Sequence, residues 1–156
     1  MTAKEYLRQI RVLDLKIKQR TDEQIKLRNE AMQNGSPGLS ADKVQTSISG
    51  DRMGELLATC AELDDEIKKR IDRFVKLRHR IIGEIQSLED RRYVEILYLH
   101  YVDYKRLEEI ACIMKKTNGE PYSYDHIASL HGYALQEFDE KILKSHGNPE
   151  QENGII

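Results

Sequence analysis

The chain of 156 residues has no tryptophan, two phenylalanines and only three prolines. Few prolines leave long stretches free to continue as helix, because a proline inside a helix costs about 3 kcal/mol or more. The remaining composition is 39% hydrophobic and 33% charged, and it is rich in Glu, Lys, Arg, Leu and Ile. This mixture favours helices and is typical of coiled coils. We therefore expect an all-α protein with one core, or a small domain with an extended arm.

Cysteine is also scarce. Cys60 and Cys112 are the two cysteines, and their separation of 52 positions matches no metal-ligand spacing. Each falls within an apolar helical pattern, so we expect two buried, reduced thiols. No apolar run has the form of a signal peptide or the length of a membrane span. These absences predict a cytoplasmic protein with no metal site and no membrane partner.

The net charge of −2 is unevenly distributed along the chain. Residues 1–50 hold nine basic and six acidic residues, and residues 51–86 hold eight of each. Residues 87–156 hold eight basic and thirteen acidic residues, which gives this segment a charge of −5. Because non-specific DNA affinity comes from neutralising phosphates, strong stand-alone DNA binding is not expected of this segment.

Two long apolar periodicities occupy the first part of the chain. Thr2 followed by Glu5 has the spacing of a capping box and predicts a helix start, and the sequence NGSPG at residues 34–38 predicts its end. Arg20 and Gln24 fall on the apolar stripe of this first helix, so its seam should be polar in the middle. The second helix shows the stronger period, about five heptads long. Its stripe consists of Met53, Leu56, Cys60, Leu63, Ile67, Ile71, Phe74, either Leu77 or Arg78, Ile81, Ile85 and Leu88.

These two periodicities predict an antiparallel, coiled-coil-like hairpin over residues 1–86, with a polar connector at residues 33–50. The first helix is shorter than the second, so part of the long seam needs another partner. That partner is either the C-terminal domain or another copy of the chain, and we expect a homo-oligomer formed through the long helices. The basic run within residues 64–80 is most simply the solvated face of the second helix. A patch that docks a protein or contacts phosphates is the alternative.

Residues 87–143 have a different pattern from the hairpin. Three apolar-striped helical segments, at residues 87–102, 106–114 and 123–143, are separated by short breaks. Ser87 and Ser123 are the expected N-caps of the first and third segments. A helix, a short helix and a longer helix joined by turns form the layout of a helix-turn-helix unit. Residues 144–156 form a polar tail that we expect to be disordered.

The residues of this segment also resemble a known family. The sequence SLEDRRYVEILYLHYV, followed by EEIA and then LHGYAL, resembles the fourth conserved region of bacterial sigma factors, which reads promoter DNA through a helix-turn-helix. Together with the N-terminal hairpin, the chain is similar to short transcription regulators of phages and prophages, including late-transcription regulators. Two features depart from the family pattern. The link KKTNGEPYS at residues 115–123 is several residues longer than the family's tight turn, and the third helix is less basic.

The resemblance implies a set of DNA-contacting residues on and beside the third helix. Ser123 matches the N-cap position, where backbone N–H groups and a hydroxyl meet a phosphate. His131 would flank the DNA backbone. The other implied contacts are base-facing Tyr124, Asp125, His126 and Ser129, and phosphate-facing Lys105, Arg106, Lys115 and Lys116.

Simpler roles exist for several of these side chains. His126 and His131 are five positions apart, off the shared helix face that metal chelation needs, and each can instead bond a neighbouring carbonyl. Lys115 and Lys116 can simply stabilise a helix C-terminus. The tyrosines are expected in the core or at its boundary, and they are Tyr98, Tyr101, Tyr122 and Tyr133.

The resemblance therefore implies a DNA-binding transcription regulator that contacts promoter DNA through a recognition helix at residues 123–135 and uses the hairpin for assembly. The alternative is an interaction module that binds RNA polymerase or another regulator without reading DNA. An enzyme is the least supported class, since the sequence shows neither a Gly-rich phosphate loop nor a grouped nucleophile and base. We predict no catalytic residues and no cofactor.

Overall fold

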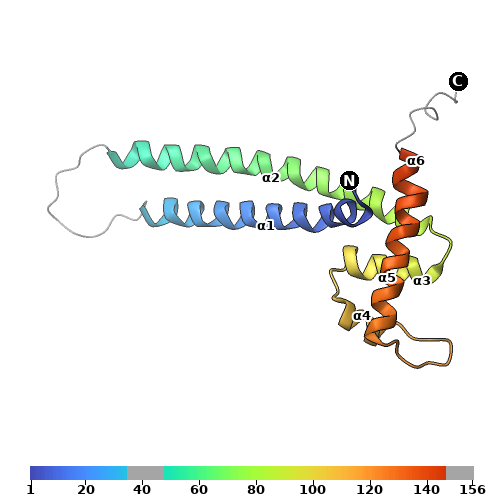
Figure 1. Ribbon diagram of the computed structural model, residues 1–156. Coiled ribbons are helices and arrows are strands. Elements are labelled where there is room, and N and C mark those ends of the chain that lie inside the picture. The colour runs from blue at the N-terminus through green and yellow to red at the C-terminus, as the bar shows by residue number, and fades with distance from the viewer. Residues whose placement is uncertain (35–47, 147–156) are drawn as a thin grey trace, which may run out of the picture. The chain divides into compact units, whose positions relative to one another are not determined.

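The computed structural model describes residues 1–34 and 48–146 (Figure 1). All regular elements in these residues are helical, which confirms the all-α prediction. One isolated antiparallel bridge joins Lys115 and Pro121. The elements in chain order are α1 (Ala3–Asn34), α2 (Ile48–Gln86), α3 (Arg91–Leu97), the π-helix η1 (Tyr98–Val102), α4 (Leu107–Ile113), α5 (Tyr124–Phe138), the π-helix η2 (Asp139–Leu143) and α6 (Lys144–His146).

The chain divides into two compact units, and each is described by itself. One unit, called the helix-pair unit, comprises Leu13–Phe74. The other, called the C-terminal unit, comprises Met1–Val12 and Val75–Ile156. The boundaries between the two units therefore fall inside α1 and inside α2. The predicted boundary between residues 86 and 87 was placed where the sequence pattern changes.

The ends of α1 follow the sequence signals. The Thr2 amide donates to the Glu5 carboxylate at 2.8 Å, and the Glu5 amide donates to the Thr2 hydroxyl at 3.3 Å, which confirms the capping box. The described part of the helix reaches Asn34, the first residue of the predicted NGSPG stop, and residues 35–38 of that stop lie outside the described residues. Most of the predicted connector at residues 33–50 lies outside the described residues.

In the helix-pair unit, α1 and α2 run antiparallel and side by side (Figure 1). Its buried apolar side chains among the described residues are Ala31, Cys60, Leu63 and Ile67. Gln24 is buried among them, as the polar middle of the seam predicted, and its amide nitrogen donates to the Asp64 carboxylate at 2.5 Å.

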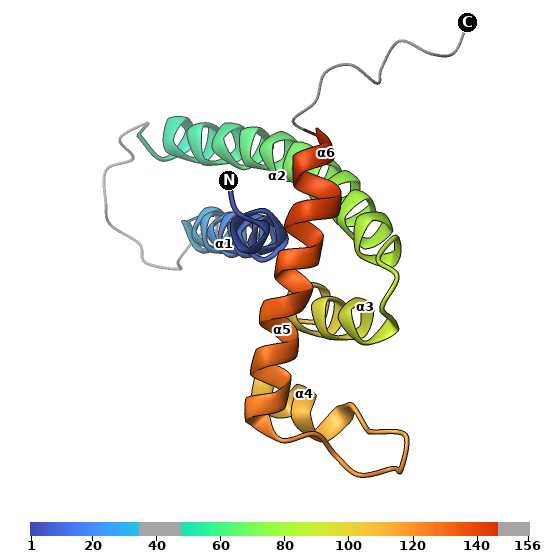
Figure 2. The ribbon, with the colours of Figure 1, turned by 45° about the vertical axis from the view of Figure 1, so that its right-hand side comes forward.

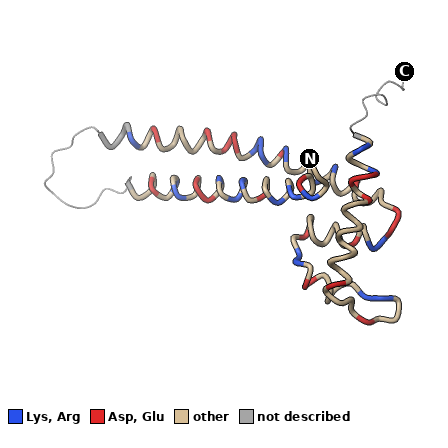
Figure 3. Tube along the Cα trace, in the orientation of Figure 1, with Lys and Arg blue, Asp and Glu red and all other residues tan. Residues whose placement is uncertain are grey.

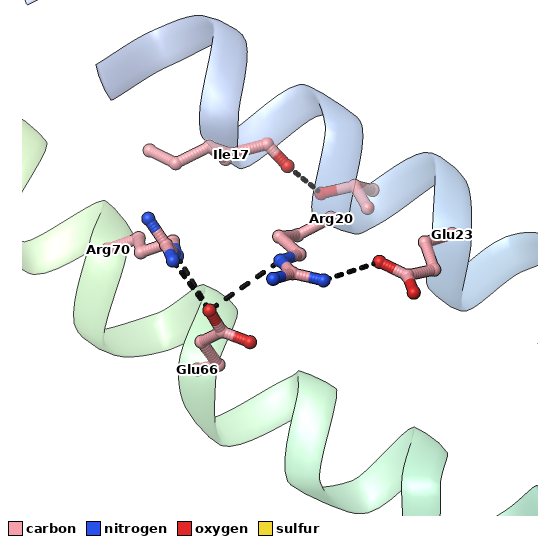
Figure 4. A network of polar contacts seen from close by, with 6 residues as sticks. Ile17, Arg20, Glu23, Glu66 and Arg70 are labelled. Atoms are coloured by element: carbon pink, nitrogen blue, oxygen red, sulfur yellow. Dashed lines mark hydrogen bonds and ion pairs between the residues drawn. The ribbon is translucent and has the colours of Figure 1, made fainter. Parts of the chain in front are cut away.

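An ionic network joins the two helices on one side of Gln24 (Figure 4). Glu66 accepts from Arg70 at 2.6 Å and lies 3.6 Å from Arg20, which in turn donates to Glu23 at 2.7 Å. The Arg70 hydrogen bond, followed by the charge of Arg20, holds the pKa of Glu66 below its ordinary value. The hydroxyl of Thr21 is occupied locally, since it donates to a backbone carbonyl one turn back. All four charged groups remain substantially exposed, so this network orients the helices more than it stabilises them.

The C-terminal unit has the larger core, and α5 packs against both α3 and α4 within it (Figure 2). Phe138 is fully buried, with its ring 6.1 Å from that of Tyr6. The first turns of α1 contribute Tyr6, Leu7 and Ile10 to this core. The other fully buried side chains of the unit include Ile81, Ile85, Ile96, Leu97, Ile110 and Ile127.

The start of α3 differs from the prediction. Asp90, not Ser87, is the N-cap, and its carboxylate accepts from the Arg92 amide at 2.8 Å. The Ser87 hydroxyl instead donates to the Glu84 carbonyl at the end of α2, so this side chain serves the preceding helix. The predicted single helix over residues 87–102 also changes to π geometry at Tyr98. The π-helix η1 ends at Val102, two residues before Tyr104, which has a positive φ of 59°.

The connection from α4 to α5 is a ten-residue loop with a tight turn inside it. Gly119 has a φ of 83°, a conformation that glycine adopts without steric cost. The Ser123 hydroxyl accepts from the His126 amide at 3.3 Å, which confirms the predicted cap of α5. Of the tail predicted to be disordered, residues 144–146 continue as α6, and residues 147–156 lie outside the described part of the chain.

The prediction for the cysteines is half right. Cys60 is buried and Cys112 is exposed, and both are free thiols. Cys112 lies immediately after the buried pair Ile110 and Ala111, so a step of about 100° carries it off the apolar stripe of α4. Across residues 1–34 and 48–146, no helix has the length and apolar character needed to cross a membrane.

Candidate functional site

A groove of about 600 Å³ lies between α3 and the first turns of α5. Four of the implied DNA-contacting residues line it together: Ser123, Asp125, His126 and Ser129. The remaining lining residues are Arg92 and Tyr93 from α3, and Leu130 and Tyr133 from α5. Sequence reasoning did not assign a site role to these four, because the packing register of α3 against α5 is not visible in the sequence.

Two local contacts hold groove-lining side chains of α5, one within the helix and one with the loop before it. The Ser129 hydroxyl donates to the Asp125 carbonyl one turn back, at 2.9 Å. The His126 ring stacks on Tyr122 with centroids 4.9 Å apart and planes 23° apart. His126 and Asp125 nevertheless stay exposed, so both can bond a ligand at this surface. The groove thus offers an imidazole, a carboxylate and a hydroxyl on adjacent turns of one helix.

Arg92 is the cation of this groove among the described residues. Its Nη2 atom lies 2.7 Å from Asp90 Oδ2 and its Nε lies 3.2 Å from Asp90 Oδ1, which is a bidentate pair. The Arg92 hydrogen bonds lower the pKa of the Asp90 carboxyl. About half of the Arg92 side chain is exposed, so its outer edge can meet an anion while Asp90 fixes its direction.

The helix that carries most of the groove has no positive charge of its own. Residues Tyr124–Phe138 include Asp125 and Glu137 but neither Lys nor Arg, and α5 is accordingly free of blue in Figure 3. A phosphate backbone approaching α5 would therefore be neutralised mainly by Arg92.

Tyr133 is 60% exposed at one edge of the groove, which corrects its expected place in the core or at its boundary. Tyr124 is also exposed, as the base-facing assignment requires. Tyr101 is buried, in agreement with the prediction, whereas Tyr98 and Tyr122 are partly buried. Two large aromatic surfaces are therefore available to a partner near the groove.

His131 lies on a different side of α5 from the groove. Its ring is only partly exposed and its Nε2 atom lies 3.1 Å from the Tyr101 hydroxyl. Burial, followed by the charges of His100, Lys4 and Arg8, lowers the pKa of His131 to about 4. His131 is therefore a neutral structural group in this unit, and the structure does not bring it together with Ser123, Asp125, His126 and Ser129.

The four implied phosphate contacts are exposed but lie outside the groove. Lys105 and Arg106 precede α4, and the Arg106 amide donates to the Glu109 carboxylate at 2.7 Å. Lys115 and Lys116 follow α4 in the loop before α5. The Lys116 ammonium lies 3.8 Å from Glu120, a surface pair that leaves it largely available.

A second, more acidic hollow of about 480 Å³ continues along α5. Its acidic groups include Glu89, Glu137 and Glu140, and Lys141 lies 3.0 Å from Glu89 and 3.1 Å from Glu137. These two carboxylates raise the pKa of Lys141. The negative character of this hollow disfavours phosphate.

Within residues 1–34 and 48–146, no group of three His, Cys, Asp or Glu side chains is placed to hold a metal ion. Comparison of the chain with protein families, with curated proteins and with solved structures found no match. The candidate site is therefore defined by the positions and chemistry of its own residues.

Proposed function

We propose that the chain is a DNA-binding transcription regulator of the phage or prophage type. In this proposal, α3, α4 and α5 form a sigma-region-four-like helix-turn-helix, and the first turns of α5 meet promoter DNA. The long helices form a hairpin that serves assembly, and the protein works in the cytoplasm. We propose no catalytic role.

The observation that carries this proposal is the exposed polar surface at the start of α5. Ser123 caps the helix, and Asp125, His126 and Ser129 project from its first two turns beside Arg92. A helix that presents such groups at its N-terminal end can bond base edges in the major groove, and an adjacent arginine can bond a phosphate.

A second candidate function is binding to RNA polymerase or another regulator without reading DNA. It is favoured by the absence of Lys and Arg from α5 and by the exposure of Tyr124 and Tyr133. Tyrosine is enriched in protein interfaces, whereas DNA-binding surfaces are usually basic.

A selection from random duplex DNA, followed by fluorescence anisotropy over a salt series, tests the first proposal. We expect an enriched motif. His126→Ala should relax specificity at one base position, at a cost of about 1–3 kcal/mol for the preferred base. Arg92→Ala should instead weaken all sequences alike and reduce the slope of log affinity against log salt by about 1.

Arg91→Ala is the matched control for Arg92→Ala, because Arg91 is exposed, adjacent in sequence and not part of the groove lining. It should leave the enriched motif and the salt slope unchanged. A selection without enrichment, combined with no salt-dependent binding, would contradict the DNA proposal. Retrieval of purified RNA polymerase in a Tyr133-dependent manner would then support the second candidate.

A further inference from the structure

One side of the helix-pair unit carries a set of exposed apolar side chains, which we call the pairing face. Met32 is 73% exposed and Leu57 is 54% exposed, although both belong to regular helix. The sequence pattern placed Met53 and Ile71 in the apolar seam between the helices, and the structure shows both side chains exposed. The pairing face consists of Ile25 and Met32 from α1 and of Met53, Leu57 and Ile71 from α2.

Helical geometry places the α1 members on the same side as an ion pair that joins the helices. Successive residues of an α-helix are about 100° apart. Counted from the buried Gln24, Arg28 is turned by about 40°, Met32 by about 80° and Ile25 by about 100°, all in one direction. Arg28 reaches across to Asp64 at 3.0 Å, so this direction is one open side of the helix pair.

The α2 members lie on that side as well. Counted from the buried Cys60, Asp64 is turned by about 40° toward Arg28. Leu57 is turned by about 60° in the same direction, and Met53 and Ile71 by about 20°. The ionic network drawn in Figure 4 lies in the other direction, because Arg20 is turned by about 40° from Gln24, and Glu66 by about 120° from Cys60, away from the pairing face. The two sides therefore differ in chemistry.

The spacing of the pairing face matches its own copy. Leu57 and Ile71 each lie seven residues from Asp64, on either side of it. A second α2, laid antiparallel with its Asp64 opposite the first, therefore brings each Leu57 against an Ile71. The Gln24–Asp64 bond shows that Ile25 is level with this midpoint, so the two Ile25 side chains would meet near the two-fold axis.

The charged side chains at the centre balance one another in this arrangement. Lys68 follows Asp64 by one turn on the exposed side of α2. The antiparallel copy places each Lys68 within about one turn of the other copy's Asp64. The two Asp64 carboxylates lie opposite each other at the centre, and Arg28 of the same copy and Lys68 of the other copy offset their like charge, with apolar side chains on either side.

The available area is sufficient for a stable contact. About 22 residues of each helix give a length of roughly 33 Å, and a pair of helices is roughly 20 Å wide. Two such faces bury about 1,300 Å² in total, which lies within the range of specific interfaces. Among its described residues, the helix-pair unit has four buried apolar side chains, so a contact on the pairing face would also supply core that it lacks.

We infer that the pairing face binds the pairing face of a second copy of this chain in antiparallel orientation, which gives a two-fold assembly of four helices. This inference goes beyond the proposed function and does not rest on it. Its interface is isologous, because each copy contributes the same residues.

Leu57→Lys in the full chain tests the inference by light scattering after size exclusion. Leu15→Lys is the matched control, because Leu15 has the same exposure of 54% and is turned about 180° from Gln24. We expect the wild type and Leu15→Lys to be dimers at tens of micromolar. Leu57→Lys should be monomeric, with the helical circular dichroism retained. A monomeric wild type, or equal loss of the dimer in both variants, would overturn the inference.

Cysteine cross-linking tests the orientation and does not depend on a destabilising change. In a Cys112→Ser background, a mixture of Leu57→Cys and Ile71→Cys chains should form a disulfide between the two different chains on mild oxidation. Each variant alone should form little, because its two thiols lie about 21 Å apart in the antiparallel pair. Efficient cross-linking of Leu57→Cys to itself would indicate a parallel pair and refute the antiparallel arrangement.

Discussion

Acidification should weaken the C-terminal unit through a single side chain, His131. In the neutral tautomer that carries its hydrogen on Nδ1, the His131 ring accepts a hydrogen bond at Nε2 from the Tyr101 hydroxyl, over 3.1 Å. Three groups face it from two elements, since Lys4 and Arg8 come from α1 and His100 comes from η1. Burial and these neighbours lower the pKa of His131 from 6.5 to about 4. Protonation would place a third cation beside Lys4 and Arg8 in a partly dry site.

The sign and size of the effect follow from proton linkage. The folded pKa lies below the unfolded one, so the unfolded chain binds a proton first as the pH falls. The contribution of His131 is fully present above pH 6.5 and is lost progressively between pH 6.5 and about 4. At pH 5 the loss amounts to about 2 kcal/mol from the pKa difference alone. Because part of the ring reaches solvent, screening reduces the expected loss to about 1 kcal/mol.

Urea unfolding at pH 7 and pH 5, followed by circular dichroism, measures this loss. His131→Gln keeps a polar partner for Tyr101 and cannot titrate, so its stability should fall about 1 kcal/mol less than that of the wild type. His79→Gln removes an exposed histidine from α2 and should behave like the wild type. The reasoning is wrong if His131→Gln loses as much stability as the wild type, or if the His131 ring titrates near 6.5 by NMR.

Four further substitutions test the packing and the caps. Phe138→Ala should lower the unfolding free energy of the C-terminal unit by about 3–5 kcal/mol in urea, because Phe138 is fully buried against Tyr6; a loss below about 1 kcal/mol would contradict this packing. Asp90→Ala should cost about 1 kcal/mol by the same assay, and Ser87→Ala less than about 0.5 kcal/mol, and the reverse order would restore Ser87 as the cap. Gln24→Leu should change stability by less than about 1 kcal/mol, because Asp64 keeps its Arg28 partner; a larger thermal destabilisation would show that the buried amide is essential.

Local signals in the sequence predicted the local structure well. The Thr2 and Glu5 capping box and the Ser123 cap depend on residues within one helical turn of each other, and both are confirmed. The choice between Ser87 and Asp90 failed because both are good N-caps. What decides between them is the end of α2, where the Ser87 hydroxyl bonds a carbonyl instead.

Properties that depend on packing between distant segments were not predictable in the same way. The pattern placed Ile71 on the apolar stripe of the second helix and Cys112 within an apolar helical segment, but both side chains are exposed. Ile71 is exposed because the stripe is wider than the contact it makes, and Cys112 because it lies beside its stripe. Arg92 drew no attention in the sequence, since only the register of α3 against α5 brings it beside His126. His131 was expected beside the DNA backbone, but its ring contacts Tyr101. The sequence does not show this contact, because Tyr101 lies thirty residues away.

The lack of positive charge on α5 links the two proposals in one further prediction. A single C-terminal unit offers one well-placed phosphate contact, Arg92, so its DNA affinity should be low. A two-fold assembly carries two such units, and the second binding event then becomes intramolecular, which can raise the overall affinity by 10²-fold or more. Leu57→Lys, although remote in sequence from α5, should therefore reduce affinity for a DNA with two sites far more than for one site. Equal losses on both DNAs, or an equal effect of Leu15→Lys, would show that pairing does not contribute to DNA binding.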